Sequence, residues 1–161
     1  MNSVVQSYQS FLDRWCDTYH GVEKVTLDEV IKAERDLAFK FPQFYLDCVT
    51  QLGVSGTSAA LLDQIVDRNL SIRDISELHH PNKIFENMRG WQSAGMPDGL
   101  IPIASDCMGN SFCFDADDGK IERATDAKIY FFDHDSNEIE VELEAETFAS
   151  WIAGFNAIAS N

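Results

Sequence analysis

Residues 100–115 read LIPIASDCMGNSFCFD, and this stretch decides the fold. An apolar run from Leu100 to Ala104 and a second run from Phe112 to Phe114 flank the dipeptide Gly109-Asn110. Apolar, β-branched and aromatic residues on both sides of a Gly-Asn turn are typical of a β-hairpin. The stretch therefore predicts two antiparallel strands joined at Gly109-Asn110.

The chain after this hairpin continues with strand patterns and then returns to a helical one. KIYFFD is short and aromatic, and EIEVELEA alternates strictly between glutamates and apolar residues. Because half-buried strands alternate in this way, we expect Ile139, Val141 and Leu143 to face a core and the glutamates to face water. The segment ETFASWIAGFNAIA has helical spacing and predicts a closing helix.

The chain before the hairpin predicts helices. SVVQSYQSFLDRWCDTYHG has apolar residues at helical spacing, and Gly21 is a suitable cap. The next helix opens with a capping box at Thr26 and is expected to end near Phe41, because proline disfavours helical geometry in the residue before it. Pro42 then begins a third helix, which Gly53 ends.

One further helix is predicted after Pro81, whereas residues 57–80 predict neither helices nor strands clearly. The whole pattern predicts the α+β class, with N-terminal helices packed on a mainly antiparallel C-terminal sheet and a closing C-terminal helix. A length of 161 residues and a hydrophobic fraction of 45% favour a single domain over residues 1–161 with a full core.

The compartment is inferred from what the sequence lacks. No apolar stretch approaches the roughly 20 residues of a membrane helix. The first residues lack the basic-then-apolar layout of a signal peptide. The four cysteines form no CxxC pair. We therefore expect a cytoplasmic protein with reduced thiols and no membrane partner.

The net charge of −15 is unevenly distributed along the chain. Residues 1–97 hold 13 acidic and 9 basic side chains, whereas residues 98–161 hold 14 acidic and 3 basic ones. This asymmetry excludes nucleic acid as an expected partner and favours a basic protein. An acidic surface that only keeps the protein soluble is the alternative. The candidate partner-binding residues are Asp115, Asp117, Asp118, Asp133, Asp135, Glu138, Glu140, Glu142 and Glu144.

No catalytic or metal-binding motif in the sequence is complete. GVSG at 53–56 is not a nucleophile elbow, and the adjacent His79 and His80 favour a loop or helix-end role over a shared metal. Cys107 and Cys113 lack histidine partners for zinc. We therefore expect no catalytic residues, no metal and no cofactor.

Two aspartate-rich loops match a calcium-binding loop in part. The loop from Asp115 has its glycine one position early, and the loop from Asp133 has Glu138 where glycine is required. Hairpin turns at Asp118-Gly119 and Ser136-Asn137 explain these residues better than calcium does.

Glu34 is the one carboxylate on the apolar face of its predicted helix. An inward carboxylate needs hydrogen-bond partners, because burial without them is costly. One interpretation is a catalytic acid with a raised pKa. The favoured interpretation is a structural acceptor for free N–H groups at the start of the helix at Pro42.

Four segments taken together resemble a known family. AERDLAFKFPQFYLDCVTQLGVSG, GLIPIASDCMGNSFCFD, IYFFDHD and ETFASWI follow one another in the order of the SUKH superfamily, the Smi/Knr-type domain. The residues that fill the family positions are Glu34, Phe41-Pro42, Pro102, Gly109-Asn110, Asp133-His134 and Phe148. Glu34, Pro42, Gly109 and Asn110 are the structural motif residues of this resemblance.

The resemblance implies a non-enzymatic role. Bacterial SUKH domains are typically immunity proteins that neutralise a toxin, and fungal members are linked to control of cell-wall synthesis. Three hypotheses follow: a toxin-neutralising protein acting through its acidic surface, possibly against a basic nuclease; a regulatory or scaffolding interaction module; and an enzyme or metal-dependent domain, which the motif search disfavours.

Overall fold

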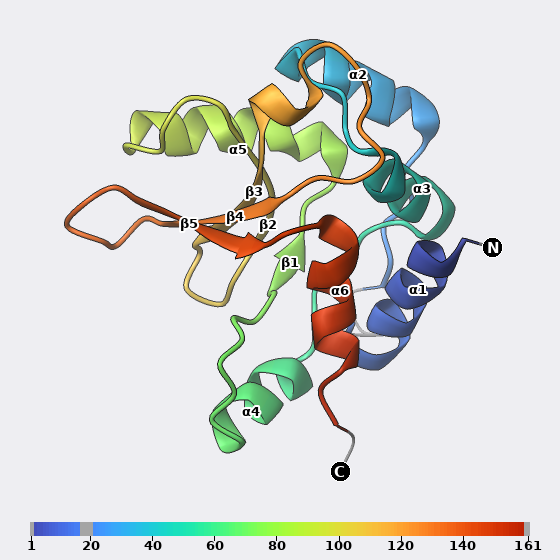
Figure 1. Ribbon diagram of the computed structural model, residues 1–161, viewed down its shortest axis with the longest axis vertical. Helices are drawn as coiled ribbons and strands as arrows, with labels where there is room; N and C mark the ends of the chain where they lie inside the picture. Colours follow the sequence, from blue (N-terminus) through green and yellow to red (C-terminus); the bar gives the residue numbers. More distant parts are fainter. Residues whose placement is uncertain (1, 17–20, 160–161) are drawn as a thin grey trace.

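The computed structural model describes residues 2–16 and 21–159 (Figure 1). Helices come first, strands dominate after residue 100, and a helix ends the fold. The elements are α1 (Ser3–Trp15), α2 (Leu27–Leu37), α3 (Gln43–Leu52), α4 (Ala59–Asp67), β1 (Glu77–Leu78), α5 (Pro81–Ser93), β2 (Leu100–Ser105), β3 (Ser111–Asp115), the 3-10 helix η1 (Ala116–Gly119), β4 (Ile129–Asp133), β5 (Glu140–Ala145) and α6 (Phe148–Asn156).

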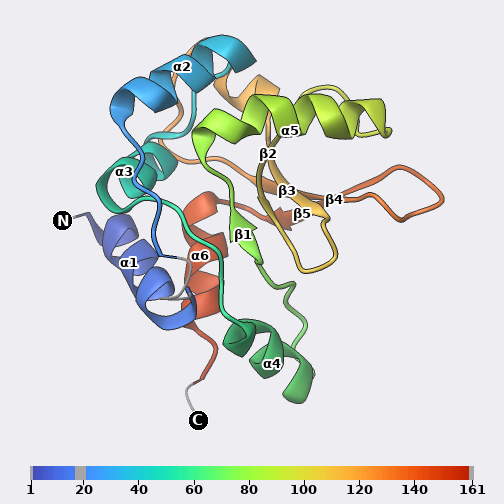
Figure 2. The ribbon, with the colours of Figure 1, turned by 180° about the vertical axis from the view of Figure 1, so that it is seen from behind.

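The strands form one antiparallel sheet in the order β1-β2-β3-β4-β5. β5 lies toward the viewer in Figure 1, and the view from behind in Figure 2 brings β1 to the front. α6 packs on one face of the sheet, with α1 behind it, and α5 covers part of the other face. The predicted α+β class and the closing helix are therefore confirmed.

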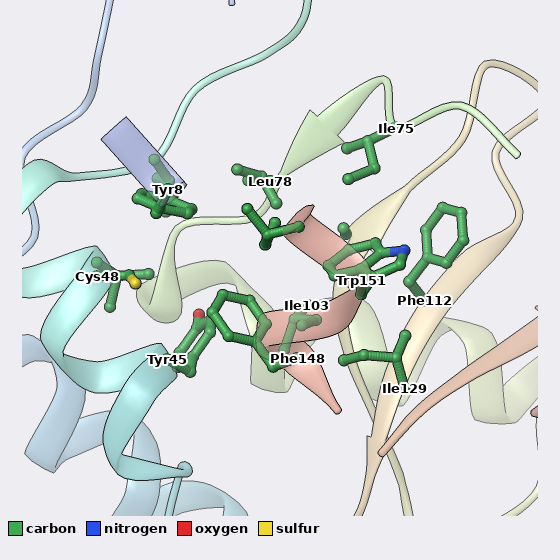
Figure 3. Packing of buried hydrophobic residues seen from close by; sticks show 14 of the residues in the cluster. Tyr8, Tyr45, Cys48, Ile75, Leu78, Ile103, Phe112, Ile129, Phe148 and Trp151 are labelled. Atoms are coloured by element: carbon green, nitrogen blue, oxygen red, sulfur yellow. The ribbon is translucent and has the colours of Figure 1, made fainter. Parts of the chain in front are cut away.

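Aromatic side chains fill the space between the sheet and α6 (Figure 3). The rings of Phe112 and Trp151 lie 5.1 Å apart, and those of Tyr45 and Phe148 lie 5.6 Å apart at nearly a right angle. Offset and edge-on ring pairs of this kind add to the stabilisation that burial alone gives. The core thus joins the sheet to α3 and α6.

Two helices end earlier than the sequence predicts. α2 stops at Leu37, and not near Phe41, because Ala38 adopts the left-handed conformation with a φ of 49°. This reversal turns Phe39 and Phe41 into the core, where both are buried. α1 stops at Trp15, since Cys16 is extended and bridges Thr57. The predicted continuation toward residue 19 lies outside the described residues.

Two other predicted helix boundaries are confirmed, and a third is shifted by one residue. Thr26 and Glu29 form the capping box of α2, and Gly53, with a φ of 81°, ends α3. Pro42 is the residue before α3 and not its first helical residue. The unassigned segment 57–80 contains α4 and the short strand β1.

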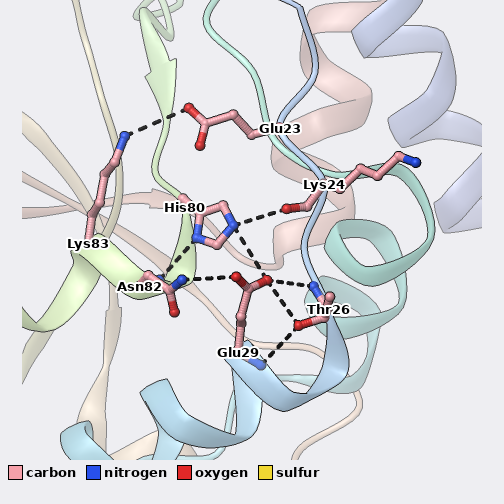
Figure 4. A network of polar contacts seen from close by, with 7 residues as sticks. All are labelled: Glu23, Lys24, Thr26, Glu29, His80, Asn82 and Lys83. Atoms are coloured by element: carbon pink, nitrogen blue, oxygen red, sulfur yellow. Dashed lines mark hydrogen bonds and ion pairs between the residues drawn. The ribbon is translucent and has the colours of Figure 1, made fainter.

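The helix predicted after Pro81 is α5, and His80 is its N-terminal cap. The Nδ1 atom of His80 accepts a hydrogen bond from the Asn82 N–H, and its Nε2 lies 3.1 Å from the Lys24 carbonyl oxygen. The Asn82 side chain donates to Glu29, which joins α5 to the start of α2 (Figure 4). The predicted helix-end role of the adjacent histidines is thus confirmed for His80.

Asp118-Gly119 is not a hairpin turn. Both residues belong to η1, and a connection of residues 116–128 joins β3 to β4. The Lys40 N–H donates to the Gly119 carbonyl at 2.7 Å, and a Cβ on Gly119 would overlap the Lys40 carbonyl and the Phe39 ring. Glycine is therefore required here for close approach to the segment after α2.

Candidate protein-binding surface

Glu34 is buried and anchors the segment between α2 and α3. Its side chain is 2% exposed, and its Oε1 accepts the Phe41 N–H at 3.0 Å. Arg123 donates to both carboxylate oxygens, at 2.5 and 3.2 Å, and also to the Phe41 carbonyl. Lys40 lies 3.6 Å from Oε2. The predicted structural acceptor is therefore found, and its partners also include two cations that the sequence did not identify.

The Gly109-Asn110 turn connects β2 to β3 as predicted. Gly109 has a φ of 83°, and the Asp106 carboxylate accepts N–H bonds from Met108 and Asn110. The Asn110 side-chain oxygen accepts the His134 N–H at 3.1 Å. This bond holds the β2–β3 turn against the β4–β5 turn, so Asn110 stabilises the fold at the point where the β4–β5 hairpin begins.

The nine candidate acidic residues do not form one continuous surface. β3 ends at Asp115 and β4 ends at Asp133, and the two strands are antiparallel, so these aspartates lie at opposite ends of the sheet. A strand of this length separates the ends by about 16 Å. Figure 1 shows η1 beside α2, whereas the β4–β5 hairpin projects away from α6. Asp117 and Asp118 therefore lie apart from Asp135 and Glu138.

The hairpin region, defined as residues 133–146, holds the larger acidic group. It contains seven carboxylates and no lysine or arginine. Asp135, Glu138 and Glu140 are exposed. The smaller acidic group consists of Asp115, Asp117 and Asp118. Burial raises the pKa of the Asp118 carboxyl, and the nearby Asp115 and Asp117 charges raise it further.

β5 presents its two faces in the reverse of the predicted way. Val141 pairs with Phe132, and Leu143 pairs with Tyr130. These residues lie on the sheet face on which α5 packs, but α5 packs over the neighbouring strands and leaves the β5 side chains exposed. Ile139, Val141 and Leu143 are 66%, 40% and 47% exposed, so they do not face a core. The prediction was wrong because alternation separates two faces without telling which one is covered.

The glutamate face of β5 is partly held by an arginine. Arg73, from the segment between α4 and β1, donates to Glu144 at 2.6 Å and to Glu142 at 2.7 Å. Its guanidinium group lies 4.0 Å above the centre of the Phe131 ring. The Glu144 side chain is 10% exposed, whereas Glu142 remains 52% exposed. Arg73 thus neutralises part of the charge of the β5 glutamates, which the sequence pattern predicts to face water.

Among the described residues, the side chains that could ligate a metal do not converge. Cys107 is exposed on the β2–β3 turn, and Cys113 is buried in β3. Burial raises the pKa of the Cys16 and Cys48 thiols to about 12, which keeps both protonated at neutral pH. Within residues 2–16 and 21–159, no three His, Cys, Asp or Glu side chains form a group suited to a metal ion.

The residues that sequence reasoning missed are the partners of the acidic groups. Arg73 and Arg123 are separated from their carboxylates by 69 and 89 positions, so only the folded chain brings them together. One signal was available for Arg123, since it is one of three basic residues after residue 97. A cation in so acidic a segment predicts a specific ion pair.

The described helices, up to residue 159, are all too short or too polar to cross a bilayer. Comparisons with curated proteins and with solved structures gave no significant match. A family model does match: the SMI1 / KNR4 family (SUKH-1), over residues 24–154. This range includes Glu34, the β2–β3 turn, the acidic hairpin and most of α6. The chain therefore belongs to the SMI1 / KNR4 family (SUKH-1).

Proposed function

We propose that this chain is a non-enzymatic, cytoplasmic immunity protein that binds a basic toxin domain through the hairpin region. The observation that carries the proposal is the concentration of seven carboxylates, without any lysine or arginine, in residues 133–146. Membership of the SMI1 / KNR4 family is consistent with a protein-interaction or immunity role.

The electrostatics of the hairpin region favour a basic partner. Asp135, Glu138 and Glu140 are exposed at a projecting end of the sheet, on the side away from α6. A nuclease toxin needs basic residues where it holds phosphates, so an acidic protrusion would both steer association and occupy the substrate site. The aspartates of η1, at the other end, would contribute to the long-range field alone.

A regulatory or scaffolding module is the second candidate function. The same exposed carboxylates and the same family membership support it, because neither feature specifies what the partner does. The two functions differ in outcome: a bound toxin loses its activity, whereas a scaffolded partner keeps it.

The test uses a toxin domain encoded beside the gene for this chain, co-purified with it and assayed for activity. We expect a tight complex, loss of toxin activity, and an association rate that falls as salt rises, while the dissociation rate changes less. A complex in which the partner stays active would support the scaffolding role instead. The absence of any complex with the neighbouring protein would contradict the proposal.

Matched charge variants locate the surface. Replacing Asp135, Glu138 and Glu140 with their amides removes three exposed charges from the hairpin, and the same change at Asp117, Asp118 and Glu122 removes three exposed charges near η1. We expect the first variant to weaken toxin binding by about tenfold or more and the second by about twofold. Equal effects would leave only the overall charge of the protein as the determinant.

A further inference from the structure

The outer edge of β5 is open. β5 is the last strand of the sheet, and its six residues pair with β4. Among the described residues, no backbone hydrogen bond joins β5 to anything else. In Figure 1 β5 lies in front, and no other ribbon crosses it. Every second residue of such a strand directs its N–H and C=O groups outward, unpaired.

The two faces beside this edge differ in chemistry. Val141 and Leu143 form an exposed apolar row on one face of β5, and Ile139, the residue before the strand, is exposed too. Glu140, Glu142 and Glu144 lie on the other, and Arg73 leaves that face with a net charge of −2, since three carboxylates face one guanidinium. Arg73 lies above Phe131 of β4, which is inward from the outer edge. The edge itself therefore remains accessible.

These features identify the kind of strand that would fit. A strand added beside β5 places its alternate side chains next to the apolar row and next to the glutamates. A second copy of β5 would bring glutamates against glutamates, and like charges across a strand pair are destabilising. The complementary strand instead alternates apolar residues with lysine or arginine, so it comes from a different protein.

We propose that the partner of this chain adds an extended strand, alternating basic and apolar residues, to the free edge of β5. Main-chain hydrogen bonds would supply affinity, and the two rows of side chains would select the sequence and its register. The proposal deepens the proposed function by naming how the basic partner docks, and it rests on that function for the partner's identity but not for the binding mode.

The test uses three fluorescent peptides of matched charge and composition. In the first, lysine and valine alternate; in the second, the valines and lysines are segregated into two blocks; the third is the alternating peptide with N-methyl groups on every second amide, on the edge that would face β5. We expect the alternating peptide to bind the full chain at least about tenfold more tightly than either control. Equal binding of all three would reduce the interaction to charge alone and overturn the proposal.

A pair of surface variants gives the second arm. Leu143→Lys alters the apolar row of β5, and Leu27→Lys makes the same change at a residue of α2 that is 52% exposed. We expect the first to weaken binding of the alternating peptide about tenfold, and the second to leave it within about twofold. Equal effects of the two variants, or a dimer of the chain that Leu143→Lys dissociates, would overturn the proposal.

The peptide arm separates this inference from the proposed function. Preference for the alternating peptide, together with failure to bind any toxin, would leave the strand-addition site standing and remove the immunity role. Neutralisation of a toxin with no dependence on Leu143 and no peptide preference would do the reverse.

Discussion

The two edges of the sheet differ in how they end. β1 is two residues long, and a segment after α3 covers it: Gly56 bridges Glu77, and the Leu78 N–H donates to the Ser55 carbonyl at 3.1 Å. β5 is six residues long, and its outer edge has no such cover among the described residues. One edge is thus completed within the chain, whereas the other is left open.

The difference indicates which edge serves the fold and which serves binding. Open edges invite unwanted pairing, and proteins protect them with charge or cover. The β1 edge is covered, and Leu78 beside it is 5% exposed. The β5 edge is guarded by glutamates, which repel a second copy of the chain while attracting a basic partner. The closed edge should therefore govern stability, and the open edge should govern association.

The same truncation at the two edges should give the largest contrast. Leu78→Ala removes a buried side chain and is expected to lower the free energy of unfolding by about 2–4 kcal/mol, because a cavity remains. Leu143→Ala, on the exposed row of β5, should change it by less than about 0.5 kcal/mol. Urea unfolding of both variants measures this, and similar losses would show that β5 is part of the cooperative core.

A second contrast concerns two glutamates that each pair with an arginine. Glu34→Gln removes the charge that faces Arg123 and Lys40 in a buried site, and we expect a loss of about 1–3 kcal/mol. Glu142→Gln, at a side chain that is 52% exposed, should cost about 0.5 kcal/mol or less. A melting temperature unchanged in Glu34→Gln would contradict the anchoring role of that carboxylate.

A smaller effect is expected from pH at the closed edge. Burial lowers the pKa of His79, and Lys83 lowers it too, while Glu77 raises it. The folded state therefore binds fewer protons than the unfolded state, so His79 contributes stability above about pH 6.5 that is lost as pH falls below that value. His79→Asn should lose less stability than the parent between pH 7.5 and 5.5. An equal or greater loss in the variant would contradict this sign.

No effect is expected from metal at the open edge. The carboxylates of the hairpin region lack the ligand spacing of a calcium loop, so calcium or a chelator should leave the melting temperature unchanged. A rise of several degrees in micromolar calcium would contradict this expectation, because ligands that bind the native state stabilise it by mass action.

The local patterns of the sequence predicted the elements well, but not their surroundings. Local sequence predicts three features correctly, because each depends on neighbouring residues: the Gly109-Asn110 turn, the capping box at Thr26 and the buried acceptor Glu34. The sequence could not predict which face of β5 is covered, because that depends on how α5 and α6 pack over the adjacent strands. Arg73 could not be assigned to Glu142, since their contact exists only after the sheet has formed.

The most direct test of the open edge is amide hydrogen exchange of the full chain with and without the alternating lysine–valine peptide. Strand addition predicts that the outward amides of β5 exchange more slowly when the peptide is bound, whereas the covered segment at residues 54–57 is unchanged. Exchange of the β5 amides that is unaltered at saturating peptide would contradict the account, because no hydrogen bonds to the edge would then have formed.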